Sequence, residues 1–240
     1  MPIGVIVNSL SVLFGGIIGA FLGDKVPERI RTSLPLILGI ASMSMGITSI
    51  VKMNTLPAVI LAVIVGTAIG ELMKFEKGIE AWANKARGPI EKLFSSKAGV
   101  ENQKEFMDQF VGIVILFCAS GTGVFGALQS GMTGDHTILL AKSILDFCTA
   151  GIFATALGYM VAAIFIPQFI VLLILFLAAS FIMSLTTPVM LADFTACGGI
   201  LMLATGFRIC GIKSFPIANM LPAMVIVMPL SWIWITYCKF

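Results

Sequence analysis

Residues 168–186 read QFIVLLILFLAASFIMSLT, and they contain no Asp, Glu, Lys or Arg. A helix needs about 20 mostly apolar residues to cross the hydrocarbon core of a bilayer. The charge-free part of the chain is longer than this segment, because no charged residue occurs between Asp146 and Asp193. The segment therefore predicts a membrane-spanning helix, with more apolar chain on both sides of it.

The rest of the chain has the same character. Of its 240 residues, 58% are hydrophobic and 11% are charged, whereas soluble domains carry roughly 25% charged residues. A water-soluble protein of this size has too little polar surface to cover so much apolar surface. We therefore expect an all-α, polytopic transmembrane helix bundle of about eight helices, with seven or nine as alternatives. The expected spans are 3–22, 34–51, 56–73, 110–128, 138–162, 168–186, 190–209 and 217–237.

Proline positions and basic residues suggest how these spans are arranged. Breaks are expected before Pro167, Pro188 and Pro216, because proline disfavours helical geometry in the residue before it. If the N-terminus lies outside, twelve Lys and Arg residues fall on the inner side, against Lys52 and Lys239 on the outer side. The positive-inside rule therefore predicts that both termini lie outside the membrane.

The one long polar segment, 74–108, is too short to form a core of its own. Phe75, Ile79, Trp82 and Ala86 recur there at helical spacing, with charged residues between them. This pattern predicts an amphipathic helix on the inner membrane surface, acting as a connector or, alternatively, as a lipid sensor or docking site. The chain is thereby divided into a first membrane repeat of three helices, a cytoplasmic connector and a second membrane half of about five helices: 1–73, 74–108 and 109–240.

The chain also resembles itself. Residues 39–46 (GIASMSMG) share a Gly-Ile start and a closing Gly with residues 199–206 (GILMLATG), and residues 54–58 (NTLPA) resemble residues 219–223 (NMLPA). On the expected topology the matching helices run in opposite directions, which predicts an inverted internal repeat. Inverted repeats around a midplane site are the architecture of many secondary transporters. Gly-Ile pairs are common in membrane helices, so a chance match is the alternative.

Lys142 and Asp146 are the most informative charged residues. They lie four residues apart and share one face of a helix, so their side chains can touch. Charged groups inside a membrane are costly and normally face the protein interior or a wet cavity. We interpret Asp146 as a cation or proton site, with Lys142 as partner or competitor and Ser143 beside them. A purely structural ion pair is the alternative.

Other polar residues interrupt the apolar spans. The run Ser120-Gly121-Thr122-Gly123 can unwind helix four and offer backbone groups to a ligand, or it can simply kink a tightly packed helix. Asn8 and Asn219 add two polar points at helix ends, although Asn219 is also a typical turn residue. Asp193 begins the seventh expected helix, where an N-cap is the plain interpretation. The candidate ion or substrate site therefore comprises Asp146, Lys142, Ser143, Asn8, Asn219, Ser120 and Thr122.

Several chemistries find no support in the sequence. There is no His-Glu-x-x-His, Gly-x-Ser-x-Gly or phosphate-loop pattern, so we expect neither an enzyme nor a cofactor. The five cysteines form no CxxC or Cys/His pattern, so we expect free thiols and no metal site. The expected partners are the lipid bilayer and a small ion or solute, with no nucleic acid. Stripes of Gly at Gly15, Gly19 and Gly23 pack helices closely, within one chain or in a homo-oligomer.

Particular strings in the chain are similar to those of a known family. They are Asn8 with Phe14-Gly15-Gly16-Ile17-Ile18-Gly19, Leu116-Phe117-Cys118, Gly131-x-x-Gly134-Asp135, Lys142-Ser143-x-x-Asp146, Gly198-Gly199-Ile200 and Asn219-x-Leu-Pro-Ala223. Together they resemble the bacterial YqgA-type membrane proteins, a domain-of-unknown-function family, over nearly the whole chain. The resemblance implies a multi-pass protein of the bacterial inner membrane, loosely described as an ion channel or pump. It implies no particular substrate.

The leading hypothesis is a secondary transporter of a small ion or solute, coupled to Na⁺ or H⁺ through Asp146. With Lys142 adjacent, Asp146 is expected to stay ionised and to bind a proton less readily. Two alternatives are a passive ion channel, and a scaffold or sensor without transport that acts through residues 74–108.

Overall fold

The computed structural model describes residues 1–79, 81, 110, 113–118, 120–183 and 186–238, which form helices, turns and no strand. Eight segments of this described chain are long and apolar enough to cross a bilayer. The all-helical membrane fold with eight spans is therefore confirmed for this part of the protein. Its helices are α1 (Ile3–Leu22), the 3-10 turn η1 (Gly23–Lys25), α2 (Glu28–Ile50), α3 (Leu56–Met73), α6 (Gly121–Thr133), α7 (Thr137–Leu157), α8 (Met160–Ala163), α9 (Phe165–Met183), α10 (Pro188–Ile209), α11 (Ile217–Met220) and α12 (Pro222–Tyr237).

The boundary between the fifth and sixth spans differs from the prediction. α7 ends at Leu157, and the following residue, Gly158, has φ +63°, a conformation that glycine adopts without the steric cost of a β-carbon. The predicted break before Pro167 is wrong, because Pro167 lies in the first turn of α9. A proline is tolerated there, since the first turn does not need its backbone N–H.

The second span begins earlier than its apolar pattern indicates. α2 starts at Glu28, six residues before the expected start at residue 34. Arg29 and Arg31 therefore lie in its first turns, and the Arg31 guanidinium donates to the Gly23 carbonyl over 2.7 Å. The extra turns are charged, so hydropathy alone could not include them in the helix.

The predicted interruption of the fourth span is present, at a narrower place than expected. Residues 113–118 are helical, Ser120 has extended geometry (φ −65°, ψ 129°), and α6 begins at Gly121. Residues 121–123 are therefore not unwound, because they form the first turn of α6. The break exposes the N-terminus of α6 to the interior of the bundle, where Thr122 and its neighbours are buried.

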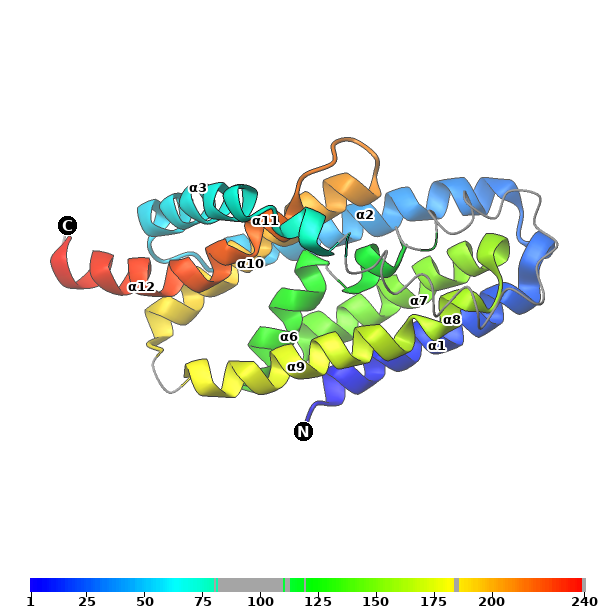
Figure 1. The fold of residues 1–240 in the computed structure, drawn as a ribbon, viewed down its shortest axis with the longest axis horizontal. Coiled ribbons are helices and arrows are strands. Elements are labelled where there is room, and N and C mark those ends of the chain that lie inside the picture. Colours follow the sequence, from blue (N-terminus) through cyan, green and yellow to red (C-terminus); the bar gives the residue numbers. More distant parts are fainter. Residues whose placement is uncertain (80, 82–109, 111–112, 119, 184–185, 239–240) are drawn as a thin grey trace.

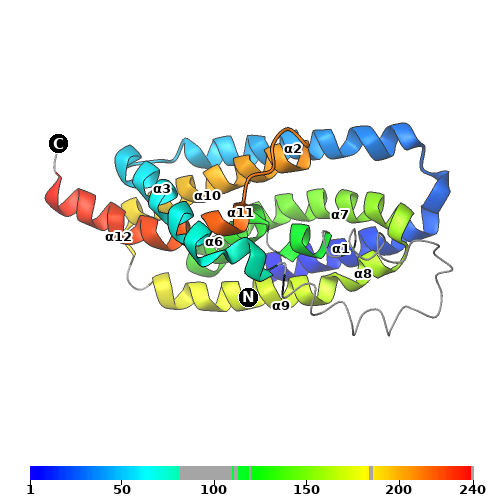
Figure 2. The ribbon, with the colours of Figure 1, turned by 45° about the horizontal axis from the view of Figure 1, so that its top comes forward.

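The long helices form two groups that lie beside each other in both ribbon views (Figures 1 and 2). The first helix group packs α7, α8 and α9 around α1, and the second helix group joins α2, α3, α10 and α12. α6 lies between them and contacts α9 on one side and α10 on the other. The first three spans are thus shared between the two groups in space, while the division of the chain into 1–73, 74–108 and 109–240 stays a prediction.

Glycines allow the closest helix contacts within this one chain. A β-carbon at Gly19 of α1 would lie 2.1 Å from the carbonyl oxygen of Gly151 in α7, and one at Gly15 would lie 2.3 Å from that of Phe147. No side chain fits at such distances, so small residues let the two backbones meet. Gly23 differs, because it has φ +45° and open space around it.

The repeated glycines of α2 and α10 face one another reciprocally. A β-carbon at Gly46 would lie 2.7 Å from the Gly199 carbonyl oxygen, and one at Gly39 would lie 2.9 Å from that of Gly206. The first glycine of each motif thus meets the last glycine of the other, in an antiparallel pair. Such reciprocity suits an internal two-fold relation between these two helices, and the inverted repeat of whole halves stays a prediction.

The polar connector is described only at its start. Lys74 ends α3 in the left-handed region (φ 54°), and residues 75–79 are helical. The Glu76 backbone N–H donates to the Asn219 side-chain oxygen over 2.7 Å, and the Glu76 carboxylate pairs with Arg208 at 3.0 Å. Trp82 and Ala86 lie outside the described residues, so the amphipathic surface helix stays a prediction.

Candidate functional site

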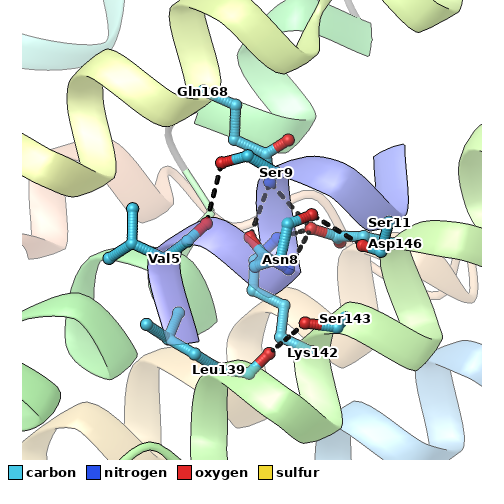
Figure 3. Close-up of polar contacts among 9 residues, drawn as sticks. All are labelled: Val5, Asn8, Ser9, Ser11, Leu139, Lys142, Ser143, Asp146 and Gln168. Atoms are coloured by element: carbon cyan, nitrogen blue, oxygen red, sulfur yellow. Dashed lines mark hydrogen bonds and ion pairs between the residues drawn. The ribbon is translucent and has the colours of Figure 1, made fainter. Parts of the chain in front are cut away.

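Four polar side chains from three spans meet inside the first helix group (Figure 3). Asn8 comes from α1, Lys142 and Asp146 come from α7, and Gln168 comes from α9. Their exposed fractions are 0%, 2%, 7% and 0% in that order. Asp146 is the tenth of the 21 residues of α7, so this polar cluster lies near the middle of a span, where charge is most costly.

One carboxylate oxygen collects the donors of the cluster. Oδ2 of Asp146 accepts from Nδ2 of Asn8 at 2.9 Å, from Nε2 of Gln168 at 2.8 Å, and from the ammonium of Lys142. Gln168 Nε2 also donates to Oδ1 of Asn8 at 2.8 Å, which links α9 directly to α1. The predicted contact between Lys142 and Asp146 is therefore present, as part of a network that joins three helices.

Two oxygens in the cluster remain without a donor. Among the described residues the hydrogen bonds to the Asp146 side chain all reach Oδ2 and none reaches Oδ1, and this side chain keeps 10% of its surface exposed. Oε1 of Gln168 is buried and has no partner in the described chain. A buried acceptor such as Gln168 Oε1 is normally satisfied by protein or by ordered water, so this oxygen, beside the Asp146 carboxylate, leaves coordination capacity for a ligand.

Lys142 is enclosed by apolar groups and by the broken fourth span. Its ammonium lies 5.9 Å from the ring centroid of Phe117, at a distance suited to a cation–π contact. A β-carbon at Gly123 would lie 3.0 Å from Cε of Lys142, so the first turn of α6 packs directly on the lysine stem. The helix break and the charged pair, singled out separately in the sequence, are neighbours in the fold.

The other predicted site residues lie outside the hydrogen-bond network of this cluster. Ser143 is buried beside Lys142, but its hydroxyl donates to the Leu139 carbonyl of its own helix over 2.7 Å. Ser120 and Thr122 are buried at the start of α6, where the Ser120 side chain makes no capping bond. Asn219 lies in α11 and binds the Glu76 backbone, so it anchors the segment after α3 at the end of the second helix group.

Asp193 is a second buried carboxylate, and its role as an N-cap of its own helix is wrong. Thr187 is the N-cap of α10, and its hydroxyl accepts from the Met190 backbone N–H. Asp193 Oδ1 instead accepts from the backbone N–H groups of Asn54 at 2.9 Å and Thr55 at 2.7 Å, just before α3. Its Oδ2 accepts from the Ser231 hydroxyl at 2.6 Å. The residue therefore caps the start of α3 from a neighbouring span.

Gln168 is the member of the cluster that the sequence analysis missed. It stands at the start of the charge-free run 168–186, directly after a proline that was interpreted as a helix break. A glutamine at a helix end has access to water, so its amide did not indicate a buried polar site. The signal that could have found it is that Gln168 has the one side-chain amide of an uncharged span. Because this span starts before Pro167, Gln168 lies inside the membrane.

Comparison with known proteins gives matches along nearly the whole chain. The family described as "Protein of unknown function (DUF554)" matches residues 3–232. The chain is 51% identical over 234 residues to "Uncharacterized protein YqgA" of Escherichia coli (strain K12), and the match covers 98% of each chain. It is 28% identical over 223 residues to "Uncharacterized membrane protein YdfK" of Bacillus subtilis (strain 168), with 93% of each chain covered. No solved structure matches the chain.

Proposed function

The chain belongs to the DUF554 family, which is described as of unknown function, and from its buried polar cluster we propose that it transports a small ion or solute. The proposed transport crosses the bacterial inner membrane and is coupled to Na⁺ or H⁺ at the cluster of Asn8, Lys142, Asp146 and Gln168. The observation that carries the proposal is a charged pair held near the middle of a span, with the buried Gln168 Oε1 beside it unused and with Asp146 Oδ1 receiving no hydrogen bond from the described residues. Ionisable residues at such depth typically belong to ion pathways or proton relays.

A hard cation suits the unused oxygens. Carboxylate and amide oxygens are preferred ligands of such ions, and Asp146 Oδ1 and Gln168 Oε1 are groups of this kind. Without a bound ion, the Lys142 ammonium neutralises Asp146. An arriving cation therefore competes with Lys142 for the carboxylate, and this competition couples the binding of the ion to movement of the lysine.

The interrupted spans support a carrier over a rigid scaffold. Discontinuous helices near the midplane are a recurring feature of secondary transporters, because their free ends provide backbone groups to ions. Here the first turn of α6 packs on Lys142, directly after the break at Ser120. A change in the position of Lys142 is thereby linked mechanically to the position of α6, which contacts both helix groups.

The proposed orientation places both termini outside the membrane. It is supported by the basic residues Lys74, Lys77 and Arg208. They lie at the same end of the second helix group, because the Glu76–Arg208 ion pair joins the short helix after α3 to the end of α10. Basic residues favour the cytoplasmic side, so this end would face the cytoplasm.

The first test is the thermal stability of the full chain in detergent at constant ionic strength, in chloride salts of Na⁺, Li⁺, K⁺ and choline. A ligand that binds the folded state stabilises it by about 2.7 kcal/mol at 100 times its Kd. We expect one cation to raise the Tm of the wild type and to leave that of Asp146→Asn unchanged. Asp135→Asn, the same change in an exposed loop, is the matched control and should keep the ion effect.

Flux in proteoliposomes completes the test. We expect saturable counterflow of the stabilising cation in the wild type and in Asp135→Asn, and its loss in Asp146→Asn. A well-folded Asp146→Asn protein that transports at the wild-type rate would contradict the mechanism. Flux that never saturates and needs no counter-ion would assign the protein to the channels.

A further inference from the structure

A large apolar cavity lies between the two helix groups, and none of the four residues of the polar cluster lines it. Its volume is about 1250 Å³, and its walls come from the end of α3 and from α6, α9, α10 and α12. Sites for drug-sized ligands usually measure about 300–1,000 Å³. A bare ion needs neither this volume nor these walls, so the cavity serves something other than the ion site.

The walls are suited to hydrocarbon of variable shape. Methionines line the cavity from four different helices, among them Met73, Met132, Met190 and Met224. Methionine side chains are flexible and polarisable, and they adapt to irregular apolar partners. Among the described lining residues Lys74 is the one that carries a charge.

The cavity extends between the two ends of the second helix group. The Asp193–Thr55 hydrogen bond places the start of α3 beside the start of α10, and the Glu76–Arg208 ion pair brings the segment after α3 to the end of α10. Met190 lines the cavity near the first of these ends, and Lys74 lines it at the second. An occupant is therefore long and apolar, with one end next to Lys74.

Lys74 itself has an unusual backbone. It is the one residue other than glycine with positive φ in the described chain, at 54°. This position ends a helix, where glycine is the common choice because a β-carbon in the left-handed region costs about 1 kcal/mol. Lys74 therefore stands at a position where glycine is the usual residue.

We propose that this cavity binds the acyl chains of an anionic phospholipid from the surrounding bilayer, with its phosphate group paired to Lys74. The bilayer supplies the ligand directly, since the lining helices are membrane spans. The positive charge at one end of an apolar groove selects an anionic headgroup, as basic residues at membrane surfaces do. The cavity shares no lining residue with the polar cluster, so the lipid site stands whether or not the protein proves to be a transporter.

The headgroup part is tested by native mass spectrometry of the full chain, released from detergent that contains equal phosphatidylglycerol and phosphatidylcholine with the same acyl chains. We expect the wild type to retain phosphatidylglycerol in preference. Lys74→Gln keeps the backbone strain and removes the charge, and it should lower this preference about fivefold, the effect of one basic residue at an anionic surface. Lys77→Gln, an exposed lysine that does not line the cavity, is the control and should leave the preference unchanged.

The acyl-chain part is tested by filling the cavity. Ala178 lines it and is exposed, so Ala178→Trp adds bulk without disturbing a packed core. We expect it to reduce retention of both lipids, whereas Ile174→Trp, on the same helix outside the cavity, should not. Equal retention of the two lipids by the wild type, equal effects of Lys77→Gln and Lys74→Gln, or no effect of Ala178→Trp would overturn the proposal. A switch from dimer to monomer in Ala178→Trp would assign the cavity to a second copy of the chain and overturn it too.

Discussion

Asp146 and Asp193 are the same residue type, buried in two different spans, and their surroundings give them different roles. Asp193 uses both carboxylate oxygens, one for two backbone N–H groups before α3 and one for the Ser231 hydroxyl. Asp146 gathers three donors on one oxygen and leaves the other without a donor in the described chain. Its neighbour Gln168 also keeps a buried oxygen unused.

The difference teaches how a structural carboxylate can be told from a binding one inside a membrane. A negative charge at the start of a helix is stabilised by the helix dipole and by backbone donors, so Asp193 needs no further partner. Asp146 is neutralised instead by Lys142, a side-chain cation that an arriving ion can displace. A satisfied carboxylate fixes the fold, while one with spare acceptors next to a displaceable cation has the means to exchange ligands.

The largest expected effect is that of Asp193→Ala on stability. The change removes the acceptor of two backbone N–H groups and of Ser231, each of which costs about 1–3 kcal/mol when buried and unpaired. We expect a loss of about 4 kcal/mol in unfolding free energy, seen as a lower Tm in detergent, with the ion-dependent stabilisation retained. Ser231→Ala should cost less, since both N–H bonds remain. An unchanged Tm together with a lost ion effect would reverse the roles assigned to the two aspartates.

The second prediction concerns the charged pair. Lys142→Met leaves Asp146 buried without its counter-ion, and breaking a buried pair in this way typically costs about 3–5 kcal/mol. The double variant Lys142→Met/Asp146→Leu should recover most of that stability, because a buried pair replaced by apolar residues is often neutral. It should nevertheless show no saturable flux. A double variant that transports normally would make the pair structural, as Asp193 is.

The third prediction isolates Gln168. Gln168→Met removes two hydrogen bonds but also an amide oxygen that is buried without a partner. Because these contributions oppose each other, we expect a stability change within about 1 kcal/mol. If Oε1 is a ligand of the cation, the apparent Kd obtained from the cation-dependent rise in Tm should increase at least tenfold. An unchanged ion titration would remove Gln168 from the site and leave Asp146 to bind alone.

The smallest effect is expected at Asp135, in the loop before α7. Hydrogen bonds from Thr137 lower the pKa of Asp135 below its usual value of 3.8. A lowered pKa stabilises the folded state above the unfolded-state pKa, and this contribution is lost as the pH falls through the folded-state pKa. Since Asp135 is exposed and screened by solvent, Asp135→Asn should cost only a few tenths of a kcal/mol at pH 7. The difference from wild type, followed by Tm, should shrink as the pH falls below the usual pKa of 3.8.

Part of the polar cluster could be predicted from local spacing. Lys142 and Asp146 lie on one face of any helix that contains both, because they are four residues apart. Gln168 could not be found in this way, since its place depended on a helix start that was expected at Pro167 and occurs earlier. The start depends on Gly158, whose positive φ ends α7. Periodicity alone does not distinguish this glycine from those that pack inside helices.

Asp193 shows the complementary limit. Its capping chemistry was the plain interpretation of an aspartate near a helix start, and capping is what it does. The helix that it caps is α3, which begins 137 positions earlier in the chain, at Leu56. Only the packing of α10 against α3 could identify that partner.

The sequence by itself determined that this protein is a bundle of about eight membrane spans with one charged pair inside. Span length and apolarity are local requirements of the hydrocarbon core, and the cost of burying charge applies wherever the residue packs. The tertiary structure decided which oxygens of Asp146 are used, that Asn8 and Gln168 join it, and that an apolar cavity opens between two helix groups. These features arise where backbones meet through glycines such as Gly19 and Gly151, and contacts between distant segments depend on how whole helices pack together.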